Sequence, residues 1–505
     1  MVQISLGKSV KPTIISLGKS VKIAIISLGK SVKRLIGVDM KELKRKIYSE
    51  LLRWKNKAVR IPLLLQGLRQ TGKTTIAFAF ANAEYENVFY VDFRKTKSAH
   101  AIFEGDFNID DIVFSISALP RDKRILRGSS LVPGKTLIVL DEIQDCPNAR
   151  SCLKYFAEDG RFDILCTGSL LGVKGYRRSK KPSRGIGVGS EEFLTMHPLD
   201  FEEFLWANGV EENVTKTLSS YLRSHKAIPS FFHQRFTDLF KQYLIVGGMP
   251  EAVSTFCESH DFHATRKVLR RILHDYESDF GTHLNDDLNL EVDDVERSLI
   301  GDVFSSIPRQ LSKENKKFQY GVVKPNGDFR TYGHAISYLQ DYGLVVKASN
   351  LSNLDNPLDW FAKDDQFKMY LCDTGLFISM LGEEIPSLIL SGELGTGKGM
   401  IYENIFADAY SKKDRPLYYY RRDSGAEVDF IDSFSTEITL IEIKAKSGAT
   451  KSSSALLNNP SCKAKHLIRI GSSNIGFVNN ILTIPHYLCF LLGPDFCWDK
   501  EDGEK

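Results

Sequence analysis

The sequence predicts an α/β protein in which a parallel sheet is followed by helical segments and by a second α/β region. Three observations support this fold class. Up to about residue 210, short apolar runs alternate with helical patterns, as strands joined by crossover helices do. Residues 211–349 read mainly as helices, and three short strands follow between residues 417 and 446. The 505 residues are enough for roughly three domains of ~150 residues.

The most informative stretch is IPLLLQGLRQTGKTT, residues 61–75. An apolar strand ends in a glycine, the spacing is G-x-x-x-x-G-K-[ST], and a helical pattern comes next. Backbone N–H groups at such glycines surround a phosphate, the lysine reaches the terminal phosphates, and the threonine hydroxyl ligates Mg²⁺. We therefore expect a nucleoside triphosphate and Mg²⁺ to be bound by Gly67, Gln70, Thr71, Gly72, Lys73, Thr74 and Thr75.

A second strand, in KTLIVLDEIQ (residues 135–144), ends in two adjacent carboxylates. In a P-loop fold, Asp141 would hold the Mg²⁺ shell and Glu142 would polarise the attacking water. The next strand, in RFDILCTGSLLG, ends in Thr167 and Ser169, whose hydroxyls suit a γ-phosphate sensor. With these residues at the strand ends, the sequence predicts hydrolysis of the bound nucleotide as well as binding.

The basic loop that follows holds six Lys/Arg between residues 174 and 184. Arg177, Arg178 or Arg184 would serve as an arginine finger on a neighbouring subunit, which implies a homo-oligomer, or would contact a phosphate backbone. A solvated basic loop is the alternative, and the sequence leaves the choice open.

The first 39 residues repeat ISLGKSVK with a period of 11, starting at Ile4, Ile15 and Ile26. No glycine stands five positions before any of these GKS glycines, and no strand precedes them cleanly, so they are not nucleotide sites. The sequence GELGTGKG, from Gly392, is excluded for similar reasons, because Gly399 replaces the hydroxyl residue. We expect residues 1–39 to form a disordered or loosely helical basic arm, and translated repeat DNA ahead of a start at Met40 is the alternative.

Charge and cysteine usage limit the possible functions. The net charge is +4, but residues 1–39 contribute +6, so the remainder carries −2. Binding of DNA or RNA would therefore depend on local patches. The eight cysteines form no C-x-x-C pair, and no apolar run approaches the ~20 residues of a membrane span. We expect a cytoplasmic protein with reduced thiols and no membrane partner.

Residues 296–350 suggest a winged-helix module. A helix is followed by polar residues, then by the candidate recognition helix Thr331–Tyr342 and the short strand LVVKA. The candidate helix carries little positive charge. The sequence is therefore compatible with two roles for this module. It could contact DNA or RNA, or it could be a structural or protein-binding module.

The last region places charges within or beside strands. Asp429 interrupts an apolar strand, and Glu442 and Lys444 lie on one face of the next. Asp429 and Glu442 would ligate Mg²⁺, Lys444 would orient or activate a water, and Glu403 on the preceding helix would complete the shell. A salt-bridged structural cluster is an equally weighted alternative.

With these motifs, the chain resembles prokaryotic AAA-type P-loop ATPases that carry a C-terminal domain of unknown function (DUF) of PD-(D/E)XK restriction-endonuclease-like fold. The resemblance runs from residue 41 to the C-terminal region and rests on GLRQTGKTT, LIVLDEIQ, TGSLLG, HPLDFEEFL, GGMPEAV, LCDTGL, YEN and the EVDF/IEIK pair. It implies ATP at the P-loop, hydrolysis served by Asp141 and Glu142, and a nuclease pattern at Glu403, Asp429, Glu442 and Lys444.

The expected organisation is a basic arm (1–39), an AAA-type core (40–210), a helical lid or linker (211–295), a winged-helix-like module (296–350) and a restriction-endonuclease-like α/β domain (351–505). The expected function is ATP binding and hydrolysis coupled to a nuclease-like domain that acts on nucleic acid. The alternative is an ATP-driven switch or protein-remodelling ATPase whose C-terminal domain binds a partner without cleaving.

Overall fold

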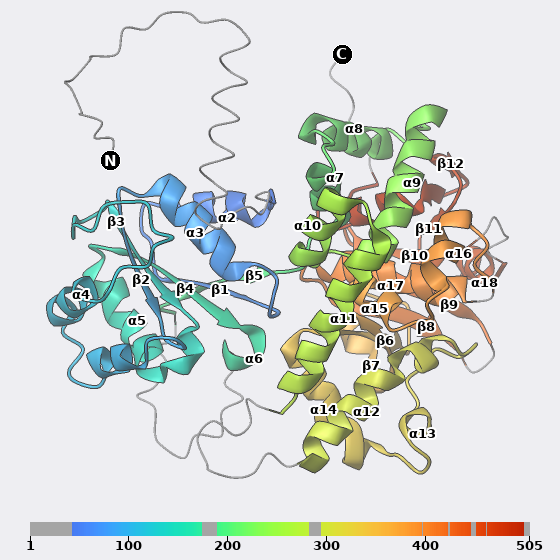
Figure 1. Cartoon of the computed structure of the whole chain (residues 1–505). Helices are drawn as coiled ribbons and strands as arrows, with labels where there is room; N and C mark the ends of the chain where they lie inside the picture. The colour runs from blue at the N-terminus through green and yellow to red at the C-terminus, as the bar shows by residue number, and fades with distance from the viewer. Residues whose placement is uncertain are drawn as a thin grey trace, which may run out of the picture. The chain divides into compact units, whose positions relative to one another are not determined.

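The computed structural model describes residues 43–173, 189–281, 294–395, 397–422, 425–445, 451–460 and 462–498. The chain divides into two units, residues 1–42 and 43–505, and the second contains every described residue (Figure 1). The expected basic arm and the candidate finger residues Arg177, Arg178 and Arg184 lie outside the described residues.

The first sheet has five parallel strands in the order β2-β3-β4-β1-β5. Their bounds are β1 Leu63–Gly67, β2 Asn87–Asp92, β3 Thr136–Asp141, β4 Asp163–Ser169 and β5 Glu192–Met196. Because β4 lies between β1 and β3, its carboxyl end separates the P-loop strand from the strand that ends in Asp141. The predicted parallel P-loop sheet is confirmed.

Helices cover both faces of this sheet (Figure 1). They are α2 Ile47–Lys55, α3 Lys73–Glu84, α4 Ile109–Ser117, α5 Pro147–Asp159, α6 Leu170–Val173 and the 3₁₀ segments η1 Lys97–Phe103 and η2 Ile143–Asp145. Alternate residues of a strand face opposite sides. Leu63 and Leu65 accordingly pack with α2 and α3, whereas Leu64 packs with α4 and α5. Strands buried on both faces explain the continuous apolar runs in the sequence.

The described residues between 201 and 342 are mainly helical. Their helices are α7 Phe201–Ala207, α8 Glu212–Arg223, α9 Ser230–Val246, α10 Pro250–Ser259, α11 Phe262–Asp279, α12 Asp294–Leu311, α13 Tyr320–Val323 and α14 Phe329–Tyr342. A capping box starts α7, since Asp200 and Glu203 each accept a hydrogen bond from the other's backbone N–H. The expected helical region is thus present in the structure.

The second sheet has eight strands in the order β12-β13-β11-β10-β9-β8-β6-β7. Their bounds are β6 Val345–Leu351, β7 Ala362–Leu371, β8 Leu417–Arg421, β9 Glu427–Phe434, β10 Glu437–Ile443, β11 His466–Gly471, β12 Gly476–Val478 and β13 Ile481–Pro485. The accompanying helices are α15 Thr374–Ser379, α16 Ile385–Ser391, α17 Lys398–Ser411 and α18 Lys451–Leu457, with 3₁₀ segments η4 Leu358–Phe361 and η5 His486–Leu491. The three strands expected between residues 417 and 446 are β8, β9 and β10.

The expected boundary at residue 350 falls inside β6. This strand pairs with β7 on one edge and, in parallel, with β8 on the other. The β6–β7 hairpin therefore belongs to the same sheet as the C-terminal strands. At the excluded GELGTGKG segment, Gly392 caps α16 and Lys398 begins α17, so no strand leads into it.

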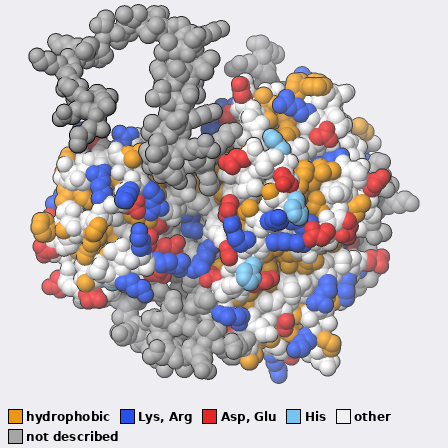
Figure 2. Space-filling model, in the orientation of Figure 1, with side chains coloured by type: hydrophobic (Ala, Val, Ile, Leu, Met, Phe, Trp, Pro, Cys, Tyr) orange, Lys and Arg blue, Asp and Glu red, His pale blue; other side chains and the backbone are white. Residues whose placement is uncertain are grey.

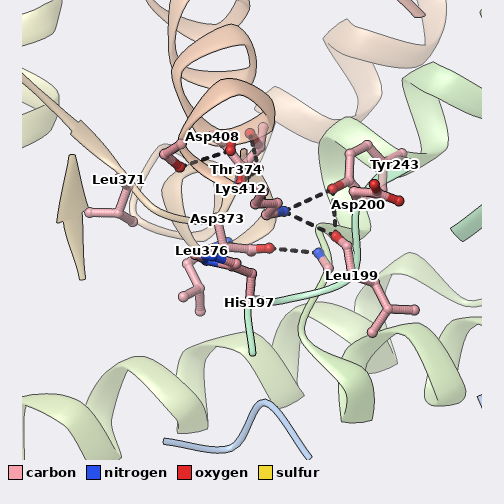
Figure 3. A network of polar contacts seen from close by, with 12 residues as sticks. His197, Leu199, Asp200, Tyr243, Leu371, Asp373, Thr374, Leu376, Asp408 and Lys412 are labelled. Atoms are coloured by element: carbon pink, nitrogen blue, oxygen red, sulfur yellow. Dashed lines mark hydrogen bonds and ion pairs between the residues drawn. The ribbon is translucent and has the colours of Figure 1, made fainter. Parts of the chain in front are cut away.

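A buried polar network joins the segment after β5 to α15 and α17 (Figure 3). Lys412 Nζ lies 2.7 Å from Asp408 Oδ1 and donates to the Leu199 carbonyl at 3.1 Å. Asp373 accepts hydrogen bonds from the backbone N–H groups of Gly248, at 2.6 Å, and Leu376, at 2.9 Å. The Asp373 and Asp408 carboxylates are thus buried where these segments meet.

Two expectations about composition can be compared with the structure. None of the described helices is long and apolar enough to cross a membrane. Within the described part of the chain the eight cysteines are free thiols.

Figure 2 shows Lys/Arg and Asp/Glu side chains interspersed over the visible face, without one large patch of a single sign.

Candidate nucleotide site and C-terminal charged cluster

Two glycines of the P-loop occupy positions that a side chain would disrupt. Gly72 begins α3 with φ of 92°, in the left-handed region. A Cβ on Gly67 would lie 2.3 Å from the carbonyl oxygen of Met196 on β5. Gly72 is required for its backbone conformation, and Gly67 is required because β1 and β5 approach closely there. A glycine thus stands at each end of the turn between β1 and α3.

Lys73 is buried at the start of α3. Its Nζ donates to the carbonyls of Gly67, at 3.0 Å, and Leu68, at 2.9 Å. Burial lowers the pKa of Lys73 to about 8, although Glu142 and Asp141 act against this shift. A buried amine whose hydrogen-bond partners are two carbonyls is well placed to receive an anionic group.

Asp141 ends β3 and is only 3% exposed. Its carboxylate accepts hydrogen bonds from the Thr74 hydroxyl, at 3.1 and 3.2 Å, and from the Tyr90 hydroxyl at 2.6 Å. The Thr167 hydroxyl is a third donor. Among the ion pairs of the described residues, none involves Asp141. A buried carboxylate beside a threonine hydroxyl is a hard oxygen donor set, so these residues fit Mg²⁺.

Glu142 follows directly, with φ of 54° in the left-handed region. Its backbone N–H donates to Thr167 Oγ1 at 3.3 Å, and its side chain accepts a hydrogen bond from Gln144 Nε2 at 2.5 Å. The bend turns the chain off the strand immediately after Asp141. Thr167 thus contacts both adjacent acidic residues.

The remaining predicted ligands are distributed around the loop. Ser169 ends β4 and is paired in register with Gly67. Thr71 is buried and donates to the Leu68 carbonyl at 2.8 Å, whereas Thr75 is exposed on α3. Gln70 directs its amide to Asp275 Oδ2 at 3.0 Å. The loop and both strand ends therefore lie together, while the Gln70 side chain is engaged elsewhere.

Sequence reasoning missed two polar residues beside the loop. Arg45 is buried and donates to the carbonyls of Thr71, at 3.1 Å, and His197, at 2.6 Å. Tyr90 lies in the middle of β2 and contacts Asp141. Neither has a sequence signal of its own, because an aromatic in a strand and an arginine beside a helix are common.

The C-terminal residues predicted to form a site come together on α17, β9 and β10. Glu403 is buried on α17, where it accepts from Tyr370 OH at 3.0 Å and forms an ion pair with Lys316. Asp429 accepts from the backbone N–H of Ile443 at 2.8 Å. Burial, with Glu403 and Glu442 nearby, raises the pKa of Asp429 to about 8.

Glu442 and Lys444 pair with each other at the end of β10. Lys444 Nζ lies 2.5 Å from Glu442 Oε1, and the buried Ser453 hydroxyl on α18 donates to the other carboxylate oxygen. The prediction placed these residues on one face of a strand, and the structure adds a helix residue that holds the glutamate.

Two lysines that sequence reasoning did not include neutralise this charged cluster. Lys316 pairs with Glu403, and Lys368, 1% exposed on β7, lies 3.0 Å from Glu427 and 3.7 Å from Glu403. In the described part of the chain, no group of three or more His, Cys, Asp or Glu residues is arranged to hold a metal ion. A lysine within the apolar run FKMYLC was the signal that could have identified Lys368.

Comparison with family models divides the chain into three matched segments. Residues 60–205 match an AAA domain. The chain contains an AAA-type P-loop ATPase domain. Residues 237–386 match a domain of unknown function (DUF8612), and residues 398–487 match another (DUF4143). The first unknown domain runs from within α9 to within α16, and the second contains all four predicted residues of the C-terminal cluster.

The search of solved structures gives weak likenesses. A Walker-type ATPase of Pyrococcus abyssi shares 12% identity with a TM-score of 0.38, over 68% of this chain and 97% of that one. A Signal Transduction ATPase with Numerous Domains (STAND) protein with a tetratricopeptide repeat sensor from Pyrococcus horikoshii shares 14%, with a TM-score of 0.24, over 74% of this chain and 49% of that one. The chain thus spans about half of the second protein. Comparison with curated proteins gives no match.

Proposed function

We propose that the AAA domain binds ATP with Mg²⁺ at the P-loop and hydrolyses it. The observation that carries the proposal is the meeting of Thr74, Asp141 and Thr167 beside Lys73, since these groups come from three separate segments of the sequence. Hydroxyls and an acid at the carboxyl ends of neighbouring strands, next to a buried amine, are the groups that recognition of ATP with Mg²⁺ requires.

Each residue has a role in this proposal. The backbone around Gly67, Gln70, Thr71, Gly72 and Thr75 surrounds the phosphates, and Lys73 contacts the terminal ones. Thr74 and Asp141 would hold Mg²⁺, which supplies charge neutralisation on the phosphates. Glu142 accepts a proton from the attacking water, and Thr167 and Ser169 contact the γ-phosphate. Arg177 or Arg178 would act on a neighbouring subunit's nucleotide, which makes a homo-oligomer part of the proposal.

Substitution of Lys73 by Ala tests the site. Hydrogen bonds to charged groups contribute about 1.5–3 kcal/mol, so the affinity for ATP should fall about 10- to 150-fold. Equilibrium titration with a fluorescent ATP analogue measures this change, and phosphate release measures turnover. Lys57→Ala, which removes an exposed lysine paired with Glu192, is the control. Wild-type affinity and turnover in Lys73→Ala would refute the proposal.

A second candidate function is metal-dependent cleavage of DNA or RNA by the C-terminal region. The order α17, β8, β9, β10, α18, β11, with β9 antiparallel and β11 parallel to β10, supports a PD-(D/E)XK-like arrangement. Glu403, Asp429, Glu442 and Lys444 would then supply the metal ligands and the water-orienting amine. Helices α12, α13 and α14 before the β6–β7 hairpin likewise support a winged helix that contacts the substrate.

The ion pairs between lysines and the C-terminal charged cluster favour a different function for this region, namely binding a partner without cleavage. Lys316 and Lys368 already neutralise Glu403, which suits a domain that binds a partner under ATP control without cleaving. The region from Asp355 to Asp365, at the tip of the β6–β7 hairpin, holds four aspartates and one lysine and exposes Trp360. An acidic tip is unfavourable for a phosphate backbone.

A matched pair of substitutions separates the two functions. Asp429→Asn should reduce Mg²⁺- or Mn²⁺-dependent cleavage about 100-fold, because it removes a metal ligand. Asp432→Asn is the control: it is buried on the same strand and pairs with Arg415, but its odd offset places it on the other face. No cleavage of single- or double-stranded DNA or RNA by the wild type with ATP would favour the switch.

A further inference from the structure

Among the described side chains that donate to the Asp141 carboxylate, Tyr90 lies outside the predicted motifs. It is on β2, two residues before Asp92, which is paired in register with Asp141 on β3. Residues two apart on a strand share a face. The Tyr90 side chain therefore lies diagonally across from Asp141 on the side of the sheet covered by α3, and its hydroxyl donates to Asp141 Oδ2 at 2.6 Å.

The phenol ring is fixed from two sides. Phe78, on α3, contacts it with ring centroids 4.7 Å apart. The Arg124 guanidinium lies over both rings, 4.1 Å from the Phe78 centroid and 5.4 Å from that of Tyr90, and is itself held by Asp122 at 2.7 Å. Such ring and cation contacts restrict the orientation of the ring. In this orientation the hydroxyl reaches Asp141.

The hydrogen bonds from the three hydroxyl groups are distributed over both oxygens of the Asp141 carboxylate. Thr167 donates to Oδ1, Tyr90 donates to Oδ2, and Thr74 lies within hydrogen-bond distance of both oxygens. Thr74 and Asp141 are proposed to hold Mg²⁺, whereas Thr167 and Tyr90 contact the Asp141 carboxylate and not the metal.

We propose that Tyr90 is a positioning residue for Mg²⁺ at the ATP site, acting through Asp141. This inference rests on the proposed ATP site and goes beyond it, because it assigns a role to a strand residue that belongs to none of the nucleotide-binding motifs. Tyr90 does not touch the nucleotide in this proposal. It sets the orientation of the carboxylate that does bind the hydrated metal.

The test compares the affinity of the full chain for a fluorescent ATP analogue in Mg²⁺ and in EDTA. In the wild type, Mg²⁺ should strengthen binding. In Tyr90→Phe, which removes only the hydroxyl, this gain should fall about 10-fold, while affinity in EDTA stays within about twofold of the wild type. ATP turnover at saturating nucleotide should shift to higher Mg²⁺ concentration.

Tyr85→Phe is the matched control. The Tyr85 hydroxyl, from the residue that ends α3, donates at 2.8 Å to Asp163, which begins β4 at the opposite, amino end of the sheet. It should leave the Mg²⁺ gain unchanged. An unchanged gain in Tyr90→Phe, or an equal loss in Mg²⁺ and EDTA, would overturn the role of Tyr90. A wild type that binds no nucleotide would instead overturn the proposed ATP site, and the inference with it.

Discussion

Glu142→Gln is expected to bind ATP like the wild type and to hydrolyse it about 10²- to 10⁴-fold more slowly. The amide keeps the size of the side chain and its contact with Gln144, but it cannot accept a proton from water. The backbone N–H of Glu142 still donates to Thr167 in the variant, so the strand end should keep its conformation. Single-turnover phosphate release, together with equilibrium ATP binding, measures the two effects separately.

The control for this charge change is Glu158→Gln on α5, where an exposed carboxylate pairs with Lys154 at 3.8 Å. It should bind and turn over ATP normally. If Glu142→Gln also turned over ATP normally, Glu142 would not be the proton acceptor. If it lost ATP binding as well, Glu142 would support the site structurally. Either result would contradict the role proposed for Glu142.

The arrangement of the candidate nucleotide site was predictable because its residues are close in sequence or are brought together by parallel pairing. The glycine spacing, the lysine and the threonine lie within one stretch, from Gly67 to Thr74. The carboxyl ends of parallel strands share one edge, which brings Asp141 and Thr167 to that stretch without further information. A continuous apolar run before each end identifies each strand.

The parts that could not be predicted depend on non-local pairing. In the sequence, Tyr90 cannot be distinguished from an aromatic residue of the core. Its hydrogen bond to Asp141 follows only from the register of β2 with β3. Lys316 lies in a connection whose contact with Glu403 is purely tertiary. The membership of β6 in the C-terminal sheet depends on its parallel pairing with β8, which no local pattern reveals.

Lys412→Met should lower the free energy of unfolding by about 3–5 kcal/mol, the range for a buried ion pair that loses one partner. Asp408 is completely buried on α17, and Lys412 is its partner at 2.7 Å (Figure 3). Burial and the nearby Asp373 raise the pKa of Asp408 to about 7, and Lys412 limits this shift. Without the ammonium, two buried aspartates would face each other with no cation between them. Denaturant unfolding at constant pH measures the change.

The pH dependence of the variant follows from the direction of this shift. A carboxyl whose pKa is higher in the folded state than in the unfolded chain favours folding in its protonated form. Its contribution is fully present below the unfolded pKa of about 3.9 and is lost as the pH rises through the folded value. Removing Lys412 raises the folded pKa of Asp408 further. Lys412→Met should therefore be closer to the wild type in stability at pH 5 than at pH 8.

The double variant Asp408→Asn/Lys412→Met decides whether charge is the cause. An asparagine keeps the shape of the side chain and its contact with Thr374 while removing the need for a cation. If the lost stability comes from an unpaired charge, the double variant should recover most of it and lose its dependence on pH. Equal destabilisation of the single and double variants at both pH values would show instead that Lys412 acts through packing and through its bond to the Leu199 carbonyl. The loss of stability would then come from the hydrogen bond that joins Lys412 to the segment after β5, and not from the ion pair within the end of α17.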